Sequence, residues 1–375
     1  MSFDYLFKEP LFIWLYAYYL FTALLESSKG FKKLSHLFFY LSTFIFIFVI
    51  GFRWKSGTDW SPYYELFNRT EFNYYSILNA GHFDVGYVIL NIIVKLFTEN
   101  YTIFLIIDAS IAIIVLAKLI HKLSPRPNFS YFIFYTNFFI SQFIGSNRRM
   151  IALSIVLWVF YYFAVFKYKK GIFYLFISFI FHRSSGFNIL AIKVPKSMFK
   201  PKTTIILIGI SFLIGLSQIP VKIIGSIGAL GGDALGGMLF NRMTEYATNS
   251  EAHIVTSTGS YVLSTTLALI KRMIFVVFYM LVASKYKIDS LTGFFYNIYI
   301  MSIVFYLGFL GTFFQMLSTY WAFIEILLMA RFFNLINSKS KIYFLTYLAL
   351  FGLLQINNAL NVYPDLYIPY HFVWE

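Results

Sequence analysis

Seven arginines of this 375-residue sequence stand where phosphate chemistry could use them. A guanidinium is planar and permanently charged, and it can hold a phosphate through two parallel hydrogen bonds. We place these seven outside a membrane or near its outer face, where basic residues are normally scarce. They are Arg53, Arg69, Arg148, Arg149, Arg183, Arg242 and Arg272. The distribution predicts an anionic partner on that side.

Three of these arginines also have simpler interpretations. Arg69 stands in a polar loop and fits a solvated surface residue. Arg242 can pair with Glu245, three residues along a helix surface. Arg272 lies inside the apolar run "TLALIKRMIF", where it either lines a cavity or extends toward the interface. For Arg242 and Arg272 the sequence leaves both interpretations open.

A second group of polar side chains lies in "GFRWKSGTDWSPYYELF", residues 51–67. This stretch follows directly on the apolar run "FFYLSTFIFIFVI", which is typical of a membrane helix. Arg53, Asp59, Tyr63, Tyr64 and Glu65 therefore fall at the rim of that helix. Such a grouping is either an ordinary loop or part of a site, depending on the rest of the chain.

Several kinds of chemistry find no support. The chain has no cysteine, which excludes a disulfide framework, a thiolate nucleophile and a zinc–sulfur site. Its six histidines are not spaced as ligands on one helix, and neither G-x-S-x-G nor H-E-x-x-H occurs. The glycine-rich "GSIGALGGDALGG" lacks the strand before and helix after that a dinucleotide loop needs. We expect no metal and no cofactor.

The elements that position these residues are membrane helices. The chain is 59% hydrophobic and 12% charged, whereas soluble domains carry about 25% charged residues. Its apolar runs are long enough to cross about 30 Å of hydrocarbon. This predicts an all-α polytopic membrane protein with a single integral domain, residues 1–375. The net charge of +14 fits lysines in cytoplasmic loops better than nucleic-acid binding.

Lysine-rich clusters between the apolar runs predict the topology. If all of them face the cytoplasm, the runs come in pairs, both termini lie outside, and about twelve helices (11–13) cross. Outer segments then cover about 53–98 and 220–260 and the tail from Asn358, with the run 85–97 lying in the outer interface. "FHRSSGFNIL" splits 171–192 into two short halves. The predicted spans are 11–26, 34–52, 101–119, 130–146, 149–168, 171–182, 184–194, 203–219, 261–284, 290–311, 316–334 and 342–357.

The opening stretch resembles the Wzy-like and EpsG-like membrane proteins, a family of bacterial O-antigen and exopolysaccharide polymerases. That family shows G-x-R-x-x-x-G-x-D-x-x-x-Y just after its second helix. Gly51, Arg53, Gly57, Asp59 and Tyr63 hold those places here. Three later segments, "RRMIALSIVLWVFYYF", "FHRSSGFNIL" and "FNRMTEY", also look similar and follow in the expected order, while the last third of the chain matches only loosely.

The later matches follow three short patterns of the family. These are R-x-x-x-A, H-x-S-[AS] and R-x-x-x-Y. The residues that hold them are Arg148 or Arg149 with Ala152, His182 with Ser184 and Ser185, and Arg242 with Tyr246.

The resemblance implies a fold, a reaction and a location. The fold is a GT-C-like bundle with an outer-face cavity. The reaction transfers a growing glycan from undecaprenyl pyrophosphate to the non-reducing-end sugar hydroxyl of a new lipid-linked repeat unit. The location is the bacterial inner membrane, with the active site facing the periplasm. The implied partners are the lipid-linked oligosaccharide as donor and acceptor, the bilayer and a chain-length regulator, and no nucleic acid.

This reaction assigns roles to the residues. The leaving pyrophosphate needs cations that stabilise its charge, and the acceptor hydroxyl needs a base. Asp59 is the first candidate for the base and His182 the second. Aromatic residues suit sugar faces, although they also line every membrane interface; the candidates are Tyr63, Tyr64 and Tyr246. The arginines expected to bind pyrophosphate are Arg53, Arg148, Arg149, Arg183, Arg242 and Arg272.

Two other functions compete with a polymerase. An O-antigen ligase-type transferase would use the same donor and similar arginines, so acceptor specificity separates the two. A flippase or transporter of lipid-linked oligosaccharide would need cationic residues along a path that reaches both faces. The arginines gather in the outer half, which favours a transferase.

Overall fold

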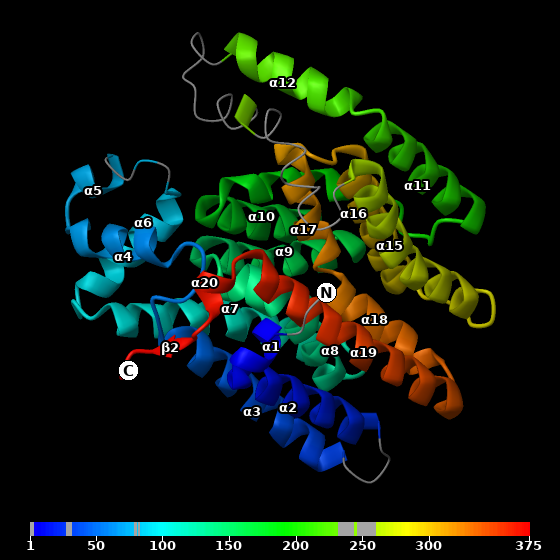
Figure 1. Ribbon diagram of the computed structural model, residues 1–375, viewed down its shortest axis with the longest axis horizontal. Coiled ribbons are helices and arrows are strands. Elements are labelled where there is room, and N and C mark those ends of the chain that lie inside the picture. The colour runs from blue at the N-terminus through cyan, green and yellow to red at the C-terminus, as the bar shows by residue number, and fades with distance from the viewer. Residues whose placement is uncertain (1–3, 28–31, 79–80, 82, 232–243, 246–259) are drawn as a thin grey trace. The chain divides into compact units, whose positions relative to one another are not determined.

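The computed structural model describes residues 4–27, 32–78, 81, 83–231, 244–245 and 260–375 (Figure 1). Over these residues the chain is almost entirely helical, and the one sheet described has two short strands. This confirms the predicted all-α fold class. The long helices follow the apolar runs of the sequence, as hydropathy predicts for membrane segments.

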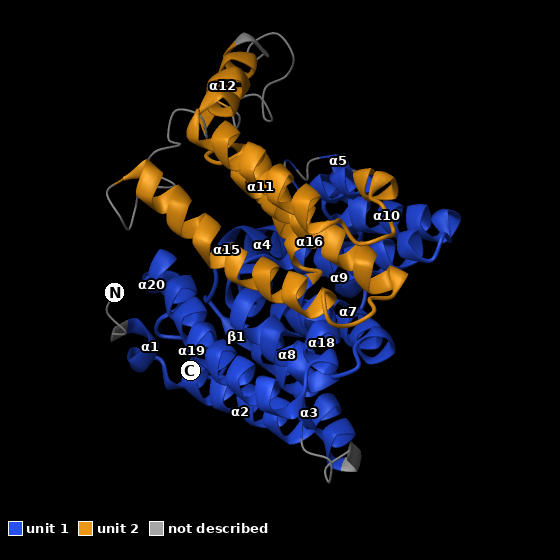
Figure 2. Cartoon of the chain, turned by 90° about the vertical axis from the view of Figure 1, so that its right-hand side faces the viewer, with its two compact units in different colours: residues 1–189, 325–375 blue, residues 190–324 orange. Residues whose placement is uncertain are grey.

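The chain divides into two compact units, coloured separately in Figure 2. Unit 1 contains residues 1–189 and 325–375, and unit 2 contains residues 190–324. The short helix η3 (Arg183–Lys193) spans the boundary. The two units are compact parts of the chain and need not be separate domains. The predicted single integral domain therefore stays a prediction.

Unit 1 holds most of the helices and both strands. Its first half comprises α1 (Asp4–Lys8), α2 (Pro10–Ser27), α3 (Lys32–Gly51), β1 (Arg53–Trp54), α4 (Trp60–Arg69), α5 (Tyr74–Leu78), α6 (Val85–Lys95) and α7 (Tyr101–Leu123). It continues with α8 (Pro127–Phe134), the π-helix η2 (Tyr135–Ile144), α9 (Asn147–Ala164), α10 (Tyr168–Phe181), α18 (Glu325–Leu335), α19 (Ser338–Val362), α20 (Pro364–Tyr367) and β2 (His371–Phe372).

Helix α9 forms the centre of unit 1. It packs against α7 on one side and α10 on the other, and α7 packs in turn against α3. Glycines permit close approaches between α3 and α7 and between α6 and α10. A Cβ on Gly51 of α3 would lie 2.9 Å from the Cα of Ile106 in α7, and one on Gly86 would lie 2.9 Å from the backbone oxygen of Ile180 in α10. The packing fixes the ends of α3, α6, α9 and α10 relative to one another.

The predicted outer segment 53–98 is helical. It contains β1, α4, α5 and α6, and Figure 1 shows these helices together at one side of the molecule. Aromatic rings join α4 to the start of α7: Trp60 stacks on Tyr64 with ring centres 4.9 Å apart, and Tyr64 meets Tyr101 edge-on at 5.2 Å. The predicted helix at 85–97 is present as α6.

The C-terminal tail returns to the stretch after α3. Strand β2 pairs antiparallel with β1, setting Arg53 opposite Phe372 and Trp54 opposite His371. Two further backbone bonds extend this contact, from Gly57 N to Leu366 O at 2.8 Å and from Val373 N to Phe52 O at 3.0 Å. The hydroxyl of Tyr370 donates to Val49 O at 2.6 Å. The tail therefore supports the loop that carries Arg53.

Unit 2 is a smaller helical body. Its elements are α11 (Pro201–Leu216), α12 (Ile219–Gly231), α15 (Tyr261–Ala283), α16 (Ser290–Gly308), η4 (Phe313–Leu317) and α17 (Ser318–Ala322). Helices α11 and α16 pack closely, because Gly215 approaches the backbone of Leu307, where a Cβ would lie 2.1 Å from the carbonyl oxygen. Helices α11 and α12 are bent by 58° at a short break.

Five of the described helices are long and apolar enough to cross a membrane, or up to seven if each bent pair is one span. The chain is therefore a helical membrane protein. The expected number of twelve crossings stays a prediction, because several expected spans form short helices: α10 has 14 residues, α11 has 16 and α18 has 11. The GT-C-like arrangement of the bundle also stays a prediction.

The break at "FHRSS" is present. Helix α10 ends at Phe181, and His182 takes an extended conformation (φ −153°, ψ 105°) before η3 begins at Arg183. The second half, predicted as the span 184–194, is a 3-10 helix, and its crossing of the membrane stays a prediction. Directly after this break, the side chain of Arg183 is mostly exposed.

Candidate functional site

Asp84 joins two of the predicted phosphate-binding arginines. Its Oδ2 lies 2.8 Å from Nη1 of Arg148, and its Oδ1 lies 2.7 Å from Nε of Arg183. The backbone N–H of Arg183 also donates to Oδ1, at 3.3 Å. Only 5% of the Asp84 side chain is exposed. One buried carboxylate therefore holds two guanidinium groups from separate helices close together.

The position of Asp84 at a helix start explains why this carboxylate is available. The residue precedes α6 in an extended conformation, where a carboxylate normally caps the helix. Here its side chain makes no capping bond. It faces the N-terminal end of α9 instead, where a cation in the first turn opposes the helix dipole. Asp84 offsets that unfavourable charge on Arg148.

Arg148 is further fixed by aromatic residues of the outer segment. Its Nε donates to the hydroxyl of Tyr63 at 3.1 Å. Its guanidinium carbon lies 5.0 Å from the centre of the Phe83 ring and 5.7 Å from that of Tyr63, distances typical of cation–π contacts. The side chain is 14% exposed. The Arg148 fork thus has a set orientation at the edge of the cluster.

Arg183 differs from Arg148 in its exposure. Its side chain is 63% exposed, although Nε is held by Asp84. The two terminal nitrogens, which point away from Nε, are the ones a phosphate would approach. Next to it, His182 Nδ1 lies 2.5 Å from Oγ of Ser184. Arg183 therefore lies beside Asp84, and His182 precedes Arg183 directly in the chain.

Asp59 also belongs to this cluster. Burial raises the pKa of its carboxyl above the ordinary value, while hydroxyls of Ser146 and Thr58 and the charges on Arg148 and Arg149 act in the opposite direction. A carboxylate with a raised pKa is a stronger base than a solvated one. Asp59 is thus placed beside the arginines with the property that a general base needs.

Arg53 has an interior position. It is 1% exposed, its Nη1 donates to Ile50 O at 3.1 Å, and its Nη2 donates to Oδ1 of Asn147. Asn147 in turn donates to the hydroxyl of Tyr87 at 3.0 Å. The expected contact between Arg53 and pyrophosphate stays a prediction, and in the structure the guanidinium is enclosed by these partners. Its contact with Asn147, the first residue of α9, fits a positioning role.

A second buried charge lies near Arg53. Asp108 of α7 is 0% exposed, and neither carboxylate oxygen has a hydrogen-bond partner among the described residues. Arg53 and Asp108 interact electrostatically. Arg53 is thus the arginine whose charge opposes the cost of burying the Asp108 carboxyl in a region of low dielectric.

The aromatic candidates divide in the same way. Tyr63 is 1% exposed and its ring packs between Phe83 and Tyr87, with ring centres 5.5 and 5.1 Å away. Its hydroxyl accepts a hydrogen bond from Arg148, and its expected role in sugar contact stays a prediction. Tyr64 is half-buried in the cluster of Trp54, Trp60 and Tyr101.

Four candidates remain, and they are Arg149, Arg272, Arg242 and Tyr246. Arg149 interacts electrostatically with Asp59, so it belongs near the site. Arg272 lies in unit 2, where Nη1 donates to Ala268 O at 3.0 Å and the guanidinium carbon is 3.5 Å from the centre of the Tyr306 ring. Arg242 and Tyr246 lie outside the described residues, so their roles stay predictions. Among the described residues, no three side chains that could bind a metal are grouped together.

Two residues of the cluster were missed in the sequence. No role was predicted for Asp84 or Asn147, because an aspartate or asparagine at the start of a helix is ordinary as a cap. The signal that could have pointed to both is the start of α9: "NRR" places two cations where a helix disfavours them, so a nearby acid was required.

The sequence was compared with protein families and with known proteins. A family profile matches residues 36–372, from the start of α3 to the end of β2. The chain belongs to the EpsG family. Neither a search of curated proteins nor one of solved structures gave a match.

Membership of the EpsG family gives the cluster a context. The match includes the Arg53 loop, α9, the His182 break and the C-terminal tail, which are the parts that meet in unit 1. It indicates a membrane protein of the polysaccharide-polymerase type and thus a glycosyltransferase-like activity. The resemblance noted in the sequence is confirmed at the level of the family.

Proposed function

We propose that this EpsG protein is a surface-polysaccharide polymerase. It transfers a growing glycan from undecaprenyl pyrophosphate to the non-reducing-end hydroxyl of a new lipid-linked repeat unit at the periplasmic face of the inner membrane. The observation that carries the proposal is the pairing of Arg148 and Arg183 on one buried carboxylate, beside Asp59 and His182. Family membership supplies the reaction type.

The arginines act on the leaving group. As the bond between the sugar and the phosphate breaks, negative charge builds on the pyrophosphate oxygens. Arg183 offers exposed terminal nitrogens, and Arg148 adds a second positive charge at the N-terminal end of α9. Helix N-termini themselves favour anions. A pyrophosphate can depart without protonation, so no acid is required on this side.

The acceptor hydroxyl needs a group that takes its proton. Asp59 is our first choice, because burial raises its pKa and it lies near Arg148 and Arg149. His182 is our second choice, and its contact with Ser184 would orient the imidazole ring. In this scheme the acceptor oxygen forms a bond to the anomeric carbon, the carbon–oxygen bond to phosphate breaks, and the proton moves to the base.

The first test uses the producing host with this gene deleted. Wild type, Arg148→Lys, Arg183→Lys and Asp59→Asn are returned at equal expression, and surface polysaccharide is separated on a gel. We expect a ladder with wild type and a single-repeat band with the variants, with the amount of polymer lowered about 10²-fold or more. Lysine cannot reproduce the two parallel hydrogen bonds of an arginine, and an amide cannot take the proton of the acceptor hydroxyl.

A matched control is Arg331→Lys. Arg331 is half-buried in α18 and Nη1 donates to the backbone oxygen of Leu123 at 2.9 Å, a bond that lysine can also make. We expect a normal ladder from it. A full ladder in the gene-deleted host would refute the polymerase. Normal ladders from all three site variants would retain the polymerase and reject this cluster as its site.

A further inference from the structure

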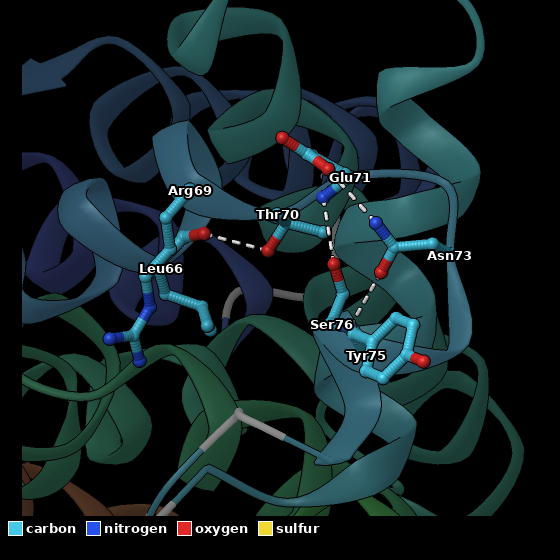
Figure 3. A pocket seen from close by; sticks show the side chains of 7 residues that line it. All are labelled: Leu66, Arg69, Thr70, Glu71, Asn73, Tyr75 and Ser76. Carbon is cyan, nitrogen blue, oxygen red and sulfur yellow. Dashed lines mark hydrogen bonds between the residues drawn. The ribbon is translucent and has the colours of Figure 1, made fainter.

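A hollow of about 210 Å³ opens in the outer segment, between the end of α4 and helix α5 (Figure 3). Most of its lining residues have a polar group, although the chain as a whole is strongly apolar. The lining residues are Leu66, Arg69, Thr70, Glu71, Asn73, Tyr75 and Ser76. Since a water takes about 30 Å³ in the liquid, the hollow has room for several waters or one sugar ring.

Hydrogen bonds within the segment give the hollow a fixed shape. The backbone N–H of Glu71 donates to Oγ of Ser76 at 2.9 Å, and Nδ2 of Asn73 donates to Oε2 of Glu71 at 2.9 Å. The backbone N–H of Ser76 donates to Oδ1 of Asn73 at 2.8 Å. Thr70 bonds back to Leu66 O at 2.6 Å. These bonds, drawn in Figure 3, order the walls before any ligand arrives.

Three side chains keep binding capacity beyond this frame. Arg69 makes no hydrogen bond with any described residue, so its guanidinium donors remain for a ligand. Glu71 uses only one of its carboxylate oxygens within the described frame. Tyr75 is 68% exposed, which leaves both its ring face and its hydroxyl accessible. Donors, an acceptor and an aromatic face are together the groups that a sugar ring requires.

One aromatic ring, Phe83, lies near both Arg69 of the hollow and Arg148 of the arginine cluster. The guanidinium carbon of Arg69 lies 6.0 Å from the centre of the Phe83 ring, and that of Arg148 lies 5.0 Å from the same centre. Asp84 follows Phe83 directly in the chain and binds Arg148. A ligand that contacts Arg69 is therefore close enough to extend to the pyrophosphate-binding arginines.

We infer that this hollow is a saccharide subsite, which takes one neutral sugar ring of the lipid-linked oligosaccharide. The inference rests on the proposed function and adds a place where the glycan is held. Arg69 donates to ring hydroxyls, the second oxygen of Glu71 accepts from one, and Tyr75 covers the apolar face of the ring. A phosphate is disfavoured in this place because Glu71 forms part of the wall.

The test measures binding by the full chain in nanodiscs with two probes. One is the repeat-unit oligosaccharide released from the host's own polysaccharide, and the other is inorganic pyrophosphate. We expect Tyr75→Ala and Arg69→Gln each to weaken oligosaccharide binding by about fivefold or more, as the loss of a stacking face or a charged hydrogen bond predicts. Pyrophosphate binding should stay at the wild-type value.

The control is Phe72→Ala. Phe72 is an aromatic residue of the same segment, is 76% exposed and lies outside the lining of the hollow, so both probes should bind as to wild type. The subsite would be overturned if Tyr75→Ala and Arg69→Gln bound the oligosaccharide as tightly as wild type. It would also be overturned if the wild-type protein bound no oligosaccharide. The proposed polymerase function would be refuted by a different result, which is a full polysaccharide ladder in the gene-deleted host.

Discussion

Burial divides the arginines of the site into two kinds. The side chain of Arg183 is mostly exposed. Arg53 is buried, and its two terminal nitrogens donate hydrogen bonds to Ile50 and Asn147. The sequence predicted the kind of residue, since both stand in motifs of the family, but exposure depends on contacts between segments far apart in the chain. The same role was therefore predicted for Arg53 and Arg183, although their side chains differ in exposure.

Arg53→Met should destabilise the protein strongly. Removal of one member of a buried charge pair costs about 3 kcal/mol or more, because Asp108 would be left uncompensated. The double variant Arg53→Met with Asp108→Asn removes both charges and should recover part of that loss. The measurement is the free energy of unfolding in mixed detergent micelles, followed by helix content.

Asp108→Asn alone completes this comparison. If the two charges interact, the double variant is more stable than the two single losses together predict. Simple addition of the single losses would show that Arg53 and Asp108 do not compensate each other.

At the scale of elements, the site depends on how the loop after α3 meets the turn before α9. Gly57 has φ +105°, and a Cβ there would lie 2.3 Å from the backbone oxygen of Ile144. The same glycine donates its N–H to Leu366 in the tail. The G-x-R-x-x-x-G-x-D pattern in the sequence therefore has a steric reason at its second glycine, which spacing alone could not show.

Gly57→Ala should displace the start of α9 and with it Arg148. We expect the polysaccharide ladder to be lost or much shortened, with a fall in stability beyond the 1–2 kcal/mol roughly expected for a left-handed residue alone. Gly81→Ala is the matched control, since Gly81 also has a positive φ (+64°) but has no atom within 4 Å of a Cβ. Equal effects of the two substitutions on the ladder would contradict the steric argument.

At the scale of the whole molecule, the sequence was most successful where long apolar runs act alone. The spans expected at 101–119, 261–284 and 290–311 correspond to α7 (Tyr101–Leu123), α15 (Tyr261–Ala283) and α16 (Ser290–Gly308). It was least successful where helices are short or broken, as at α10 and η3. Hydropathy identifies a membrane span by the length of an apolar run. The composition of a short helix therefore does not show whether it crosses the membrane.

The orientation of the chain can be measured directly because it contains no cysteine. Single cysteines at Phe72 and Lys170, both exposed, would report on the outer segment and on a lysine-rich loop. In intact spheroplasts a membrane-impermeant maleimide should label Phe72→Cys, and it should label Lys170→Cys only after the membrane is opened. The reverse pattern would place the arginine cluster on the cytoplasmic side.

The pairing of β1 with β2 has a consequence for the order of events during synthesis. His371 donates its N–H to Ser56 Oγ, across 315 residues of chain. At about 5–20 residues per second, the ribosome needs on the order of half a minute to make the intervening chain. Through that interval α3 and its loop can already be inserted while the tail that supports Arg53 does not yet exist. In a nascent chain of this protein the Arg53 loop therefore lacks its support, which forms only after the C-terminal tail has been synthesised.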